Sequence, residues 1–328
     1  MLEDALQPHV SIIRGGGGPD QRERSLASGS NVYHTLRQRH NVVDVHLTPE
    51  GTYELQGRAV PLSDILSLGG VVFSTLAGAE ARRLETACRA QQVPCVSNAH
   101  TIYGGSSAME RRDILRKSGV KTIPYWRLAA NYDGAEDHLY GEILEQLRYP
   151  VVISPLPDTF SAGALVVRNE AELMEVLDRC FDLEAPTAVS DTYQGNLYTV
   201  LVMGKFRGEA PYAFPARELL HDHDVANTYD QSTADYRTTP EAPTDVIALA
   251  KSAFNELHLR NLAQVTILKT PDDELYVLDV DPHPSIDRHS LLFEVASDVG
   301  ATLEEVFTLT VKDARRRAGK LKNTANQL

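Results

Sequence analysis

Short apolar runs alternate with stretches of helical periodicity along most of this chain. Apolar runs that predict strands lie at 10–14, 42–47, 71–74, 94–97 and 197–203. Helical spacing of apolar residues predicts helices at 106–117, 134–147, 170–180 and 244–258. Two further strands are expected between residues 149 and 167. Because strands and helices alternate, the pattern predicts an α/β protein, with a small parallel sheet in residues 10–98.

A β-hairpin is predicted in the last third of the chain. The apolar runs 262–270 and 274–281 are separated by the turn residues Pro271, Asp272 and Asp273. At the end of the second run, Asp279 and Asp281 stand two residues apart, so they point to the same face of a strand. Such a pair can bind one divalent cation, although the same pattern is also typical of a solvated strand edge or turn.

Composition narrows the functional classes. With 328 residues, 42% of them hydrophobic and 23% charged, the chain can form two or three domains with several cores. A net charge of -13 argues against nucleic acid as a partner. Three scattered cysteines, Cys88, Cys95 and Cys180, fit neither a disulfide framework nor a zinc site. Because no apolar run is long enough to span a bilayer, we expect a cytoplasmic protein without membrane contact.

Five segments carry a family resemblance when they are read in order. In residues 10–38, Glu23, Ser25, Leu26, Ser28 and Gly29 match an expected Glu-x-Ser-Leu-x-Ser-Gly motif. The other four are residues 93–126, residues 149–177, the terminal hairpin and the Ser290-Leu291 dipeptide. Together they resemble the D-alanine:D-alanine ligase family of the ATP-grasp superfamily.

The resemblance implies an α/β ATP-grasp fold with an N-terminal Rossmann-like (pre-ATP-grasp) domain. We expect that domain in residues 1–98, a central ATP-grasp subdomain in 99–189 and a C-terminal ATP-grasp subdomain in 190–328. A cleft is expected between the second and third. The polar stretch 221–243 lacks periodicity, and in the family its place is taken by a mobile loop that closes over the substrates.

The family joins a carboxylate to an amine at the expense of ATP, so the resemblance also implies ATP, Mg²⁺ and a set of site residues. The positions that correspond to catalytic residues are Glu23, Arg111 and Gln264. The positions for ATP are Arg111, Ser154, Ser161, Gly163 and Leu197. Substrate positions are Glu23, Ser290 and Leu291, and the metal positions are Asp279 and Asp281.

Several of these positions depart from the family pattern. Ser154 replaces a phosphate-binding lysine, and Arg111 replaces a second lysine. Gln264 replaces the oxyanion arginine, Thr266 a magnesium aspartate and Leu197 the ribose glutamate. Losing two charge-assisted contacts at about 1.5 to 3 kcal/mol each removes two to four decades of affinity. ATP binding is therefore predicted to be weak or absent. The combined substitutions Ser154→Lys, Leu197→Glu and Thr266→Asp are expected to recover it.

Further departures affect the loops of the expected site. Phe160 stands where a small residue would let the backbone approach phosphate, Ala77 stands at a substrate-binding histidine, and Ser285 replaces a glycine. The residues that match also have structural interpretations. Glu23 suits a helix start, Ser290 suits a helix N-cap, and the glycines of 15–18 suit a tight turn.

Three functional hypotheses follow. The first is a pseudo-ligase that acts as a binding, scaffold or regulatory protein. The second is an active ATP-dependent carboxylate-amine ligase with altered substrates, which uses Arg111, Asp279 and Asp281. The third is a sensor that binds an amino acid or dipeptide through Glu23 and Ser290 without turnover. The missing charges favour the first over the second. A homodimer and a protein partner both stay open.

Overall fold

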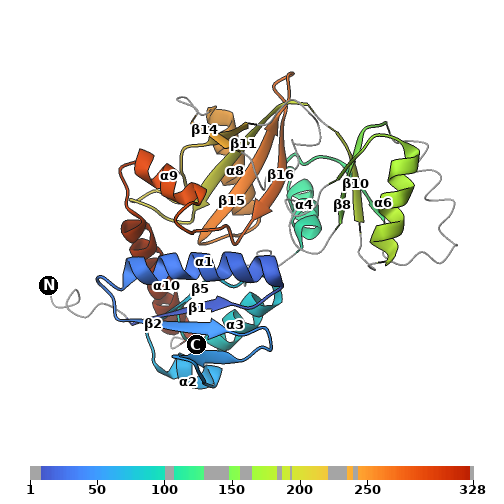
Figure 1. Ribbon diagram of the computed structural model, residues 1–328. Helices are drawn as coiled ribbons and strands as arrows, with labels where there is room; N and C mark the ends of the chain where they lie inside the picture. Colours follow the sequence, from blue (N-terminus) through green and yellow to red (C-terminus); the bar gives the residue numbers. More distant parts are fainter. Residues whose placement is uncertain are drawn as a thin grey trace.

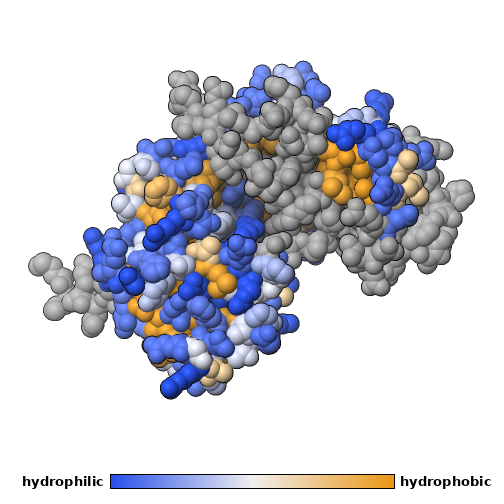
Figure 2. All heavy atoms as spheres, in the orientation of Figure 1, coloured by the Kyte–Doolittle hydropathy of each residue, from blue (hydrophilic) through white to orange (hydrophobic). Residues whose placement is uncertain are grey.

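The computed structural model describes residues 9–99, 107–128, 148–155, 165–182, 187–192, 194–220, 235–238 and 243–325. Within these residues the chain is mixed α/β and forms three sheets (Figure 1). The part of the molecule around the first sheet presents a mostly hydrophilic face with separate apolar patches (Figure 2). None of the helices in the described part is both long and apolar enough to cross a membrane.

The first sheet has the strand order β4-β3-β2-β1-β5-β6. Its strands are β1 (Val10–Gly15), β2 (Val42–Leu47), β3 (Tyr53–Leu55), β4 (Arg58–Ala59), β5 (Val71–Ser74) and β6 (Cys95–Val96). Strands β2, β1, β5 and β6 run parallel, whereas β3 and β4 add antiparallel pairs at one edge. The predicted parallel sheet is confirmed.

Alternation along β1 explains how this sheet is covered on both faces. Ile12 packs toward α1 (Pro19–Leu36), and the neighbouring Ile13 packs toward α2 (Leu62–Ser67) and α3 (Gly78–Ala90). Both isoleucines are fully buried. Successive residues of a strand point to opposite faces, so a continuous apolar run is needed where helices cover both sides.

The second sheet is antiparallel, with the order β7-β10-β8-β9. Its strands are β7 (Tyr125–Leu128), β8 (Val151–Pro155), β9 (Leu165–Val167) and β10 (Thr187–Asp191). Helix α6 (Glu170–Asp182) covers it, because Leu173 and Leu177 lie one helical turn apart and pack on Val151 and Ile153. The helix predicted at 134–147 lies outside the described residues.

The third sheet is also antiparallel, with the order β14-β13-β11-β15-β16, and β12 pairs with β11. Its strands are β11 (Asn196–Met203), β12 (Tyr212–Ala213), β13 (Arg217–Leu220), β14 (Asp235–Thr238), β15 (Leu262–Lys269) and β16 (Leu275–Asp281). Helices α8 (Thr244–Glu256) and α4 (Ala108–Lys117) pack against this sheet. The predicted hairpin is confirmed as β15 and β16.

Part of the polar stretch was predicted wrongly. Residues 235–238 form β14, which pairs with β13 from Arg217↔Thr238 to Leu220↔Asp235. An edge strand takes its backbone hydrogen bonds from its neighbour and can keep polar side chains. Its sequence therefore need not show the alternation of apolar residues from which strands are predicted. Residues 221–234 lie outside the described part.

The last two helices return the chain to the first sheet. After α9 (Leu291–Asp298), helix α10 (Leu303–Ala325) packs against α1, β5 and β6. The rings of Phe73 in β5 and Phe307 in α10 meet edge to face, with centroids 5.9 Å apart. One apolar core therefore joins the two ends of the chain and includes residues of the third sheet, such as Leu201 and Met203.

Candidate functional site

The turn from β1 into α1 brings the start of that helix close to the neighbouring strand β2. Gly15, Gly16 and Gly17 have φ values of +97°, +64° and +71°. A Cβ on Gly15 would lie 2.4 Å from the carbonyl oxygen of Leu47, so only glycine fits there. Ser25 of α1 closes the turn by accepting a 2.9 Å hydrogen bond from the Gly15 N–H. The sequence-based prediction of a tight strand-to-helix turn is confirmed.

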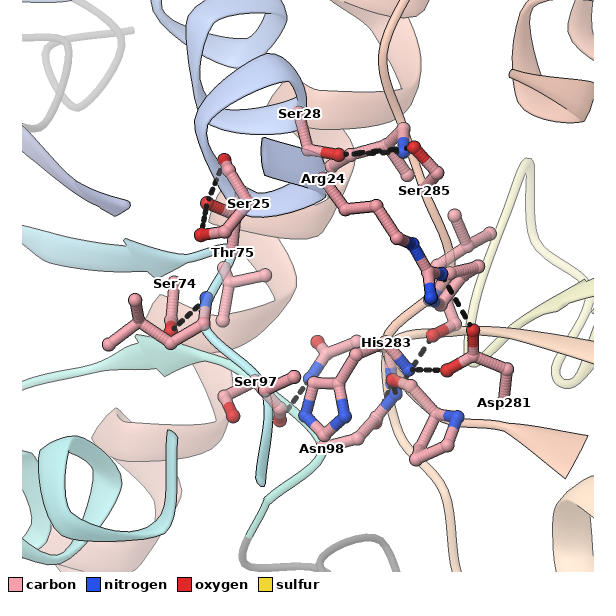
Figure 3. A pocket seen from close by; sticks show the side chains of 18 of the residues that line it. Arg24, Ser25, Ser28, Ser74, Thr75, Ser97, Asn98, Asp281, His283 and Ser285 are labelled. Atoms are coloured by element: carbon pink, nitrogen blue, oxygen red, sulfur yellow. Dashed lines mark hydrogen bonds and ion pairs between the residues drawn. The ribbon is translucent and has the colours of Figure 1, made fainter. Parts of the chain in front are cut away.

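A cavity of about 510 Å³ lies beside this turn. It is bounded by α1, the loop between β5 and α3, the end of β6, the start of β15, the loop after β16, and α10. Figure 3 shows Arg24 of α1 and Asp281 of β16 facing each other at this cavity, with His283 close by. The inner wall is apolar and is formed by Phe73, Val96, Leu262, Ile286, Val306 and Phe307.

The hydroxyl groups on the cavity wall are already hydrogen-bonded within the protein. Ser74 Oγ accepts from the Leu76 N–H at 3.3 Å, and Ser97 Oγ accepts from the Ala99 N–H at 3.0 Å. Thr310 Oγ1 donates to the Val306 carbonyl at 2.8 Å. The wall therefore offers less polar capacity than its serines and threonines suggest.

Asp281 and Arg24 form an ion pair at the polar end of the cavity. Arg24 Nη2 lies 3.1 Å from Asp281 Oδ2, and the other carboxylate oxygen accepts from the His283 N–H at 2.8 Å. About half of the Arg24 side chain is exposed, so this pair adds little stability. Its effect is chemical, because a guanidinium already stands beside a carboxylate that was predicted to bind a metal.

Asp279 lies deeper and beside a second arginine. Its side chain is buried, and Arg111 Nη2 of α4 lies 3.9 Å from its Oδ1. Burial raises the pKa of Asp279, Arg111 counteracts this, and the nearby charge of Asp281 raises it further. Arg111 was predicted as an ATP position, and in the structure it contributes to the cavity wall and to the surroundings of Asp279.

The donor set around the acid pair does not fit a divalent cation in this arrangement. Thr266 lies opposite Asp279 in the hairpin and Gln264 lies opposite Asp281, so neither neighbour adds a carboxylate. In the described part of the chain, no three His, Cys, Asp or Glu side chains come together as a metal-binding group. Mg²⁺ is usually held by one or two carboxylates together with waters and substrate phosphates, so the number of carboxylates alone does not decide the fit; what opposes a cation here is that each carboxylate already faces an arginine.

The other predicted site residues occupy diverse places. Leu197 is buried at 1% exposure, with Ile123, Leu219, Leu268 and Leu278 around it. Ser154 lies in β8 opposite Ala188. Phe160, Ser161 and Gly163 lie outside the described residues.

The dipeptide Ser290-Leu291 starts α9. Ser290 is the N-cap residue, but its hydroxyl donates to the Asp287 carbonyl at 2.7 Å instead of capping the helix. Leu291 is buried in the core that joins the two ends of the chain. Their roles in substrate binding stay predictions.

Sequence reasoning selected Glu23 and missed its neighbour. Glu23 is exposed on α1 and does not contribute to the cavity wall, whereas Gln21, Arg24, Ser25 and Ser28 do. The sequence held a signal for Arg24, because Ser25 and Ser28 already matched the family motif and residues three or four apart share one face of a helix. The helix phase that places Ser28 at the cavity also places Arg24 there.

Asn98 connects the first sheet to the third. Its Nδ2 donates to the carbonyls of Leu262 and Pro282 at 2.8 and 2.7 Å. Its Oδ1 accepts from the N–H groups of Arg260 and Asn261 at 3.2 and 3.0 Å. The side chain is 2% exposed, and its bonds to Pro282 and Asn261 are buried, whereas those to Leu262 and Arg260 are partly buried. Asn98 therefore fixes both the start of β15 and the loop after β16.

His283 is the second missed residue, and it makes a testable pH prediction. Burial lowers the pKa of His283 to about 4, with the positive charges of Arg111 and Arg24 acting in the same direction and Asp281 opposing them. Between pH 6.5 and about 4 the unfolded chain binds a proton that the folded chain excludes. The contribution of neutral His283 to the free energy of unfolding is fully present above pH 6.5. It is lost as the pH falls through this window, by up to about 3 kcal/mol.

The measurement is urea unfolding of the wild type and His283→Gln at several pH values. The difference between the two proteins isolates His283 from the titration of Asp279. We expect the wild type to lose stability relative to the variant from pH 6.5 down to pH 4. Parallel curves for the two proteins would contradict the prediction.

Comparisons with known proteins identify the family to which this chain is similar. The family model described as "D-ala D-ala ligase C-terminus" matches residues 114–311. The D-alanine–D-alanine ligase B of Chromobacterium violaceum is 26% identical over 306 residues, which cover 90% of this chain and 94% of that protein. The D-alanine–D-alanine ligase of Cupriavidus metallidurans is 25% identical, over 88% and 87% of the two chains.

Solved structures share the fold. The D-alanine-D-alanine ligase from Coxiella burnetii superposes with a TM-score of 0.76 at 17% identity and covers 98% of both chains. The D-alanine–D-alanine ligase from Bacillus anthracis, solved in complex with ATP, has a TM-score of 0.74 at 17% identity. It covers 95% of this chain and 99% of its own.

Proposed function

Because the chain belongs to the D-alanine:D-alanine ligase family and has its ATP-grasp fold, we propose that it is a catalytically impaired member. In this proposal it acts as a binding or regulatory protein. The observation that carries the proposal is the pairing of both acid-pair residues with arginines. Arg24 lies at 3.1 Å from Asp281 and Arg111 at 3.9 Å from Asp279.

These arginines oppose a divalent cation at the acid pair. A guanidinium about 5 Å from Mg²⁺ repels it by roughly 7 kcal/mol at an effective dielectric constant of 20. The two carboxylates attract the metal, but each already neutralises an arginine. Without a metal at this position, the phosphates of ATP lose a main counter-charge in ligation.

Leu197 supports the same conclusion from the nucleotide side. The family position for the ribose glutamate is an apolar residue within a leucine cluster. It cannot accept a hydrogen bond from a ribose hydroxyl, and Gln264 carries no charge for an oxyanion. In this proposal three requirements of ligation are therefore unmet: the metal, the ribose acceptor and the oxyanion charge.

The test is calorimetric titration of the purified protein with magnesium-ATP, together with phosphate release in the presence of D-alanine. We expect no binding at about 1 mM nucleotide, because the lost contacts amount to decades of affinity. We also expect no phosphate release. Micromolar, magnesium-dependent ATP binding or phosphate release stimulated by any amino acid would favour the alternative of an active ligase with altered substrates.

A pair of α1 variants tests the arginine pairing itself. Arg24→Gln removes a guanidinium from α1, and Arg37→Gln removes one from the residue that caps the end of the same helix, but only Arg24 contacts Asp281. We expect Arg24→Gln to strengthen the binding of Mn²⁺, used as a probe cation, and Arg37→Gln to leave it unchanged. Equal Mn²⁺ affinities would mean that Arg24 does not shield the acid pair.

The cavity favours a second candidate function, a sensor that binds an amino acid or dipeptide without turnover. The cavity is 510 Å³, within the size range of small-molecule sites. It carries opposite charges at one end, from Arg24 and Asp281. The sensor is compatible with the impaired-ligase proposal, because it needs neither ATP nor a metal.

A further inference from the structure

We infer that the cavity between α1, α10 and the loop after β16 binds a free amino acid with a large apolar side chain. The inference rests on the proposed function in one respect, since it takes binding without turnover as the role of this site. It adds the chemical class of the ligand. The polar end of the cavity would hold the charged groups, and the inner wall would hold the side chain.

The inner wall selects an apolar group. Phe73 and Phe307 meet there edge to face, and Val96, Leu262, Ile286 and Val306 complete a surface with no charge. The neighbouring hydroxyls are already partly used within the protein, since those of Ser74 and Ser97 each accept one hydrogen bond and that of Thr310 donates one. A polar group placed at this depth would lose water and gain few partners, whereas an apolar group gains contact area.

The polar end carries complementary groups for a zwitterion. Asp281 can accept from an ammonium, and Arg24 can donate to a carboxylate when the two separate around a ligand. Half of the Arg24 side chain is exposed, so it can move at low cost. Figure 3 shows both side chains at the same end of the cavity.

His283 adds an unused hydrogen-bonding group. Its Nε2 is shielded from solvent and has no hydrogen-bond partner in the described part of the structure. A buried polar atom without a partner costs free energy, and a ligand that bonds to it would recover that cost.

The size of the cavity argues against alanine as the best ligand. A methyl side chain would leave most of the apolar wall uncovered, and an apolar cavity that stays empty loses the contacts of its lining. A leucine or phenylalanine side chain would cover Phe73, Val96 and Phe307 together. We therefore expect affinity to increase with the apolar area of the side chain.

The experiment is calorimetric titration without nucleotide, using glycine and both enantiomers of alanine, leucine and phenylalanine. At least one enantiomer of leucine or phenylalanine is expected to bind on the order of tenfold or more tightly than alanine. Two probes test the amine and the carboxylate of the ligand separately, since 3-phenylpropionate lacks the amine and 2-phenylethylamine lacks the carboxylate. Both are expected to bind more weakly than phenylalanine.

Matched variants locate the site. Ala77→Phe adds a ring at the cavity wall. Ala79→Phe adds the same ring two residues further along the chain, on the exposed surface of α3. We expect Ala77→Phe to weaken binding of the apolar amino acid at least about tenfold and Ala79→Phe to leave it unchanged. If Ala77→Phe does not fold, Leu262→Ala removes part of the wall and is expected to weaken phenylalanine binding but not alanine binding.

Two results would overturn the inference. One is that no amino acid of the panel binds, and the other is that alanine binds as tightly as leucine and phenylalanine. Unchanged binding in both Ala77→Phe and Leu262→Ala would also overturn it. Magnesium-ATP turnover together with selective binding of apolar amino acids would contradict the proposed function, and with it binding without turnover, but would leave the ligand class inferred here standing.

Discussion

Replacing Asn98 by alanine is expected to lower the free energy of unfolding by about 4 kcal/mol or more. The change leaves the N–H groups of Arg260 and Asn261 without one acceptor, and the carbonyls of Leu262 and Pro282 without one donor. Each buried group left without a partner costs about 1 to 3 kcal/mol. The loss is large because one side chain serves four backbone groups.

The measurement is urea unfolding followed by circular dichroism and by the fluorescence of Trp126, the single tryptophan. Asn255→Ala is the matched control, since Asn255 is exposed on α8 and its loss should change stability by less than about 0.5 kcal/mol. Equal midpoints for Asn98→Ala and Asn255→Ala would mean that water replaces the Asn98 bonds without cost.

Much of the fold could be predicted from the sequence because the elements that carry it are locally patterned. The strands β2 and β5 begin and end where the apolar runs predict, and β15 and β16 form the predicted hairpin. Among the strands that were not predicted are β3, β4, β7, β10, β12, β13 and β14. Strands of this kind depend on backbone pairing with a neighbour, and pairing leaves no period in the sequence of one strand.

The site was less predictable, since its decisive contacts join distant segments. Asp279 and Asp281 were recognised from their spacing on one strand. Their partners Arg111 and Arg24 come from α4 and α1, and Arg24 is separated from Asp281 by 257 positions in the chain. No local pattern indicates such pairs, so the sequence predicted the two carboxylates but not the arginines beside them, and the metal role of Asp279 and Asp281 stays a prediction.

Leu197 shows a second limit of sequence reasoning. From alignment alone, Leu197→Glu appears among the changes that should restore nucleotide binding. In the structure, Leu197 lies opposite Leu219 of β13 and Leu268 of β15, and its side chain is 1% exposed. Leu197, which the sequence analysis interpreted as a lost ribose-binding charge, is therefore also an integral part of an apolar core.

Leu197→Glu is accordingly expected to destabilise the protein by about 4 kcal/mol or more at pH 7, and not to restore ATP binding. The substitution removes buried leucine contacts and places a carboxylate among leucines, where desolvation raises its pKa. Because the unfolded chain ionises this group more readily, the destabilisation should grow as the pH rises from 4.5 to 8. Unfolding in urea at these two pH values measures the effect.

Two controls separate the causes. Leu197→Gln removes the same leucine contacts without an ionisable group, so its stability difference from Leu197→Glu should widen with pH. Asn196→Glu places the carboxylate on the exposed neighbour in the same strand and should stay within about 0.5 kcal/mol of the wild type. If Leu197→Glu, combined with Ser154→Lys and Thr266→Asp, stays folded and binds magnesium-ATP, missing charge alone explains the loss of ligation. If the combination unfolds while Ser154→Lys with Thr266→Asp does not, the leucine core has replaced the ribose site. A charged residue at position 197 is then incompatible with the folded protein.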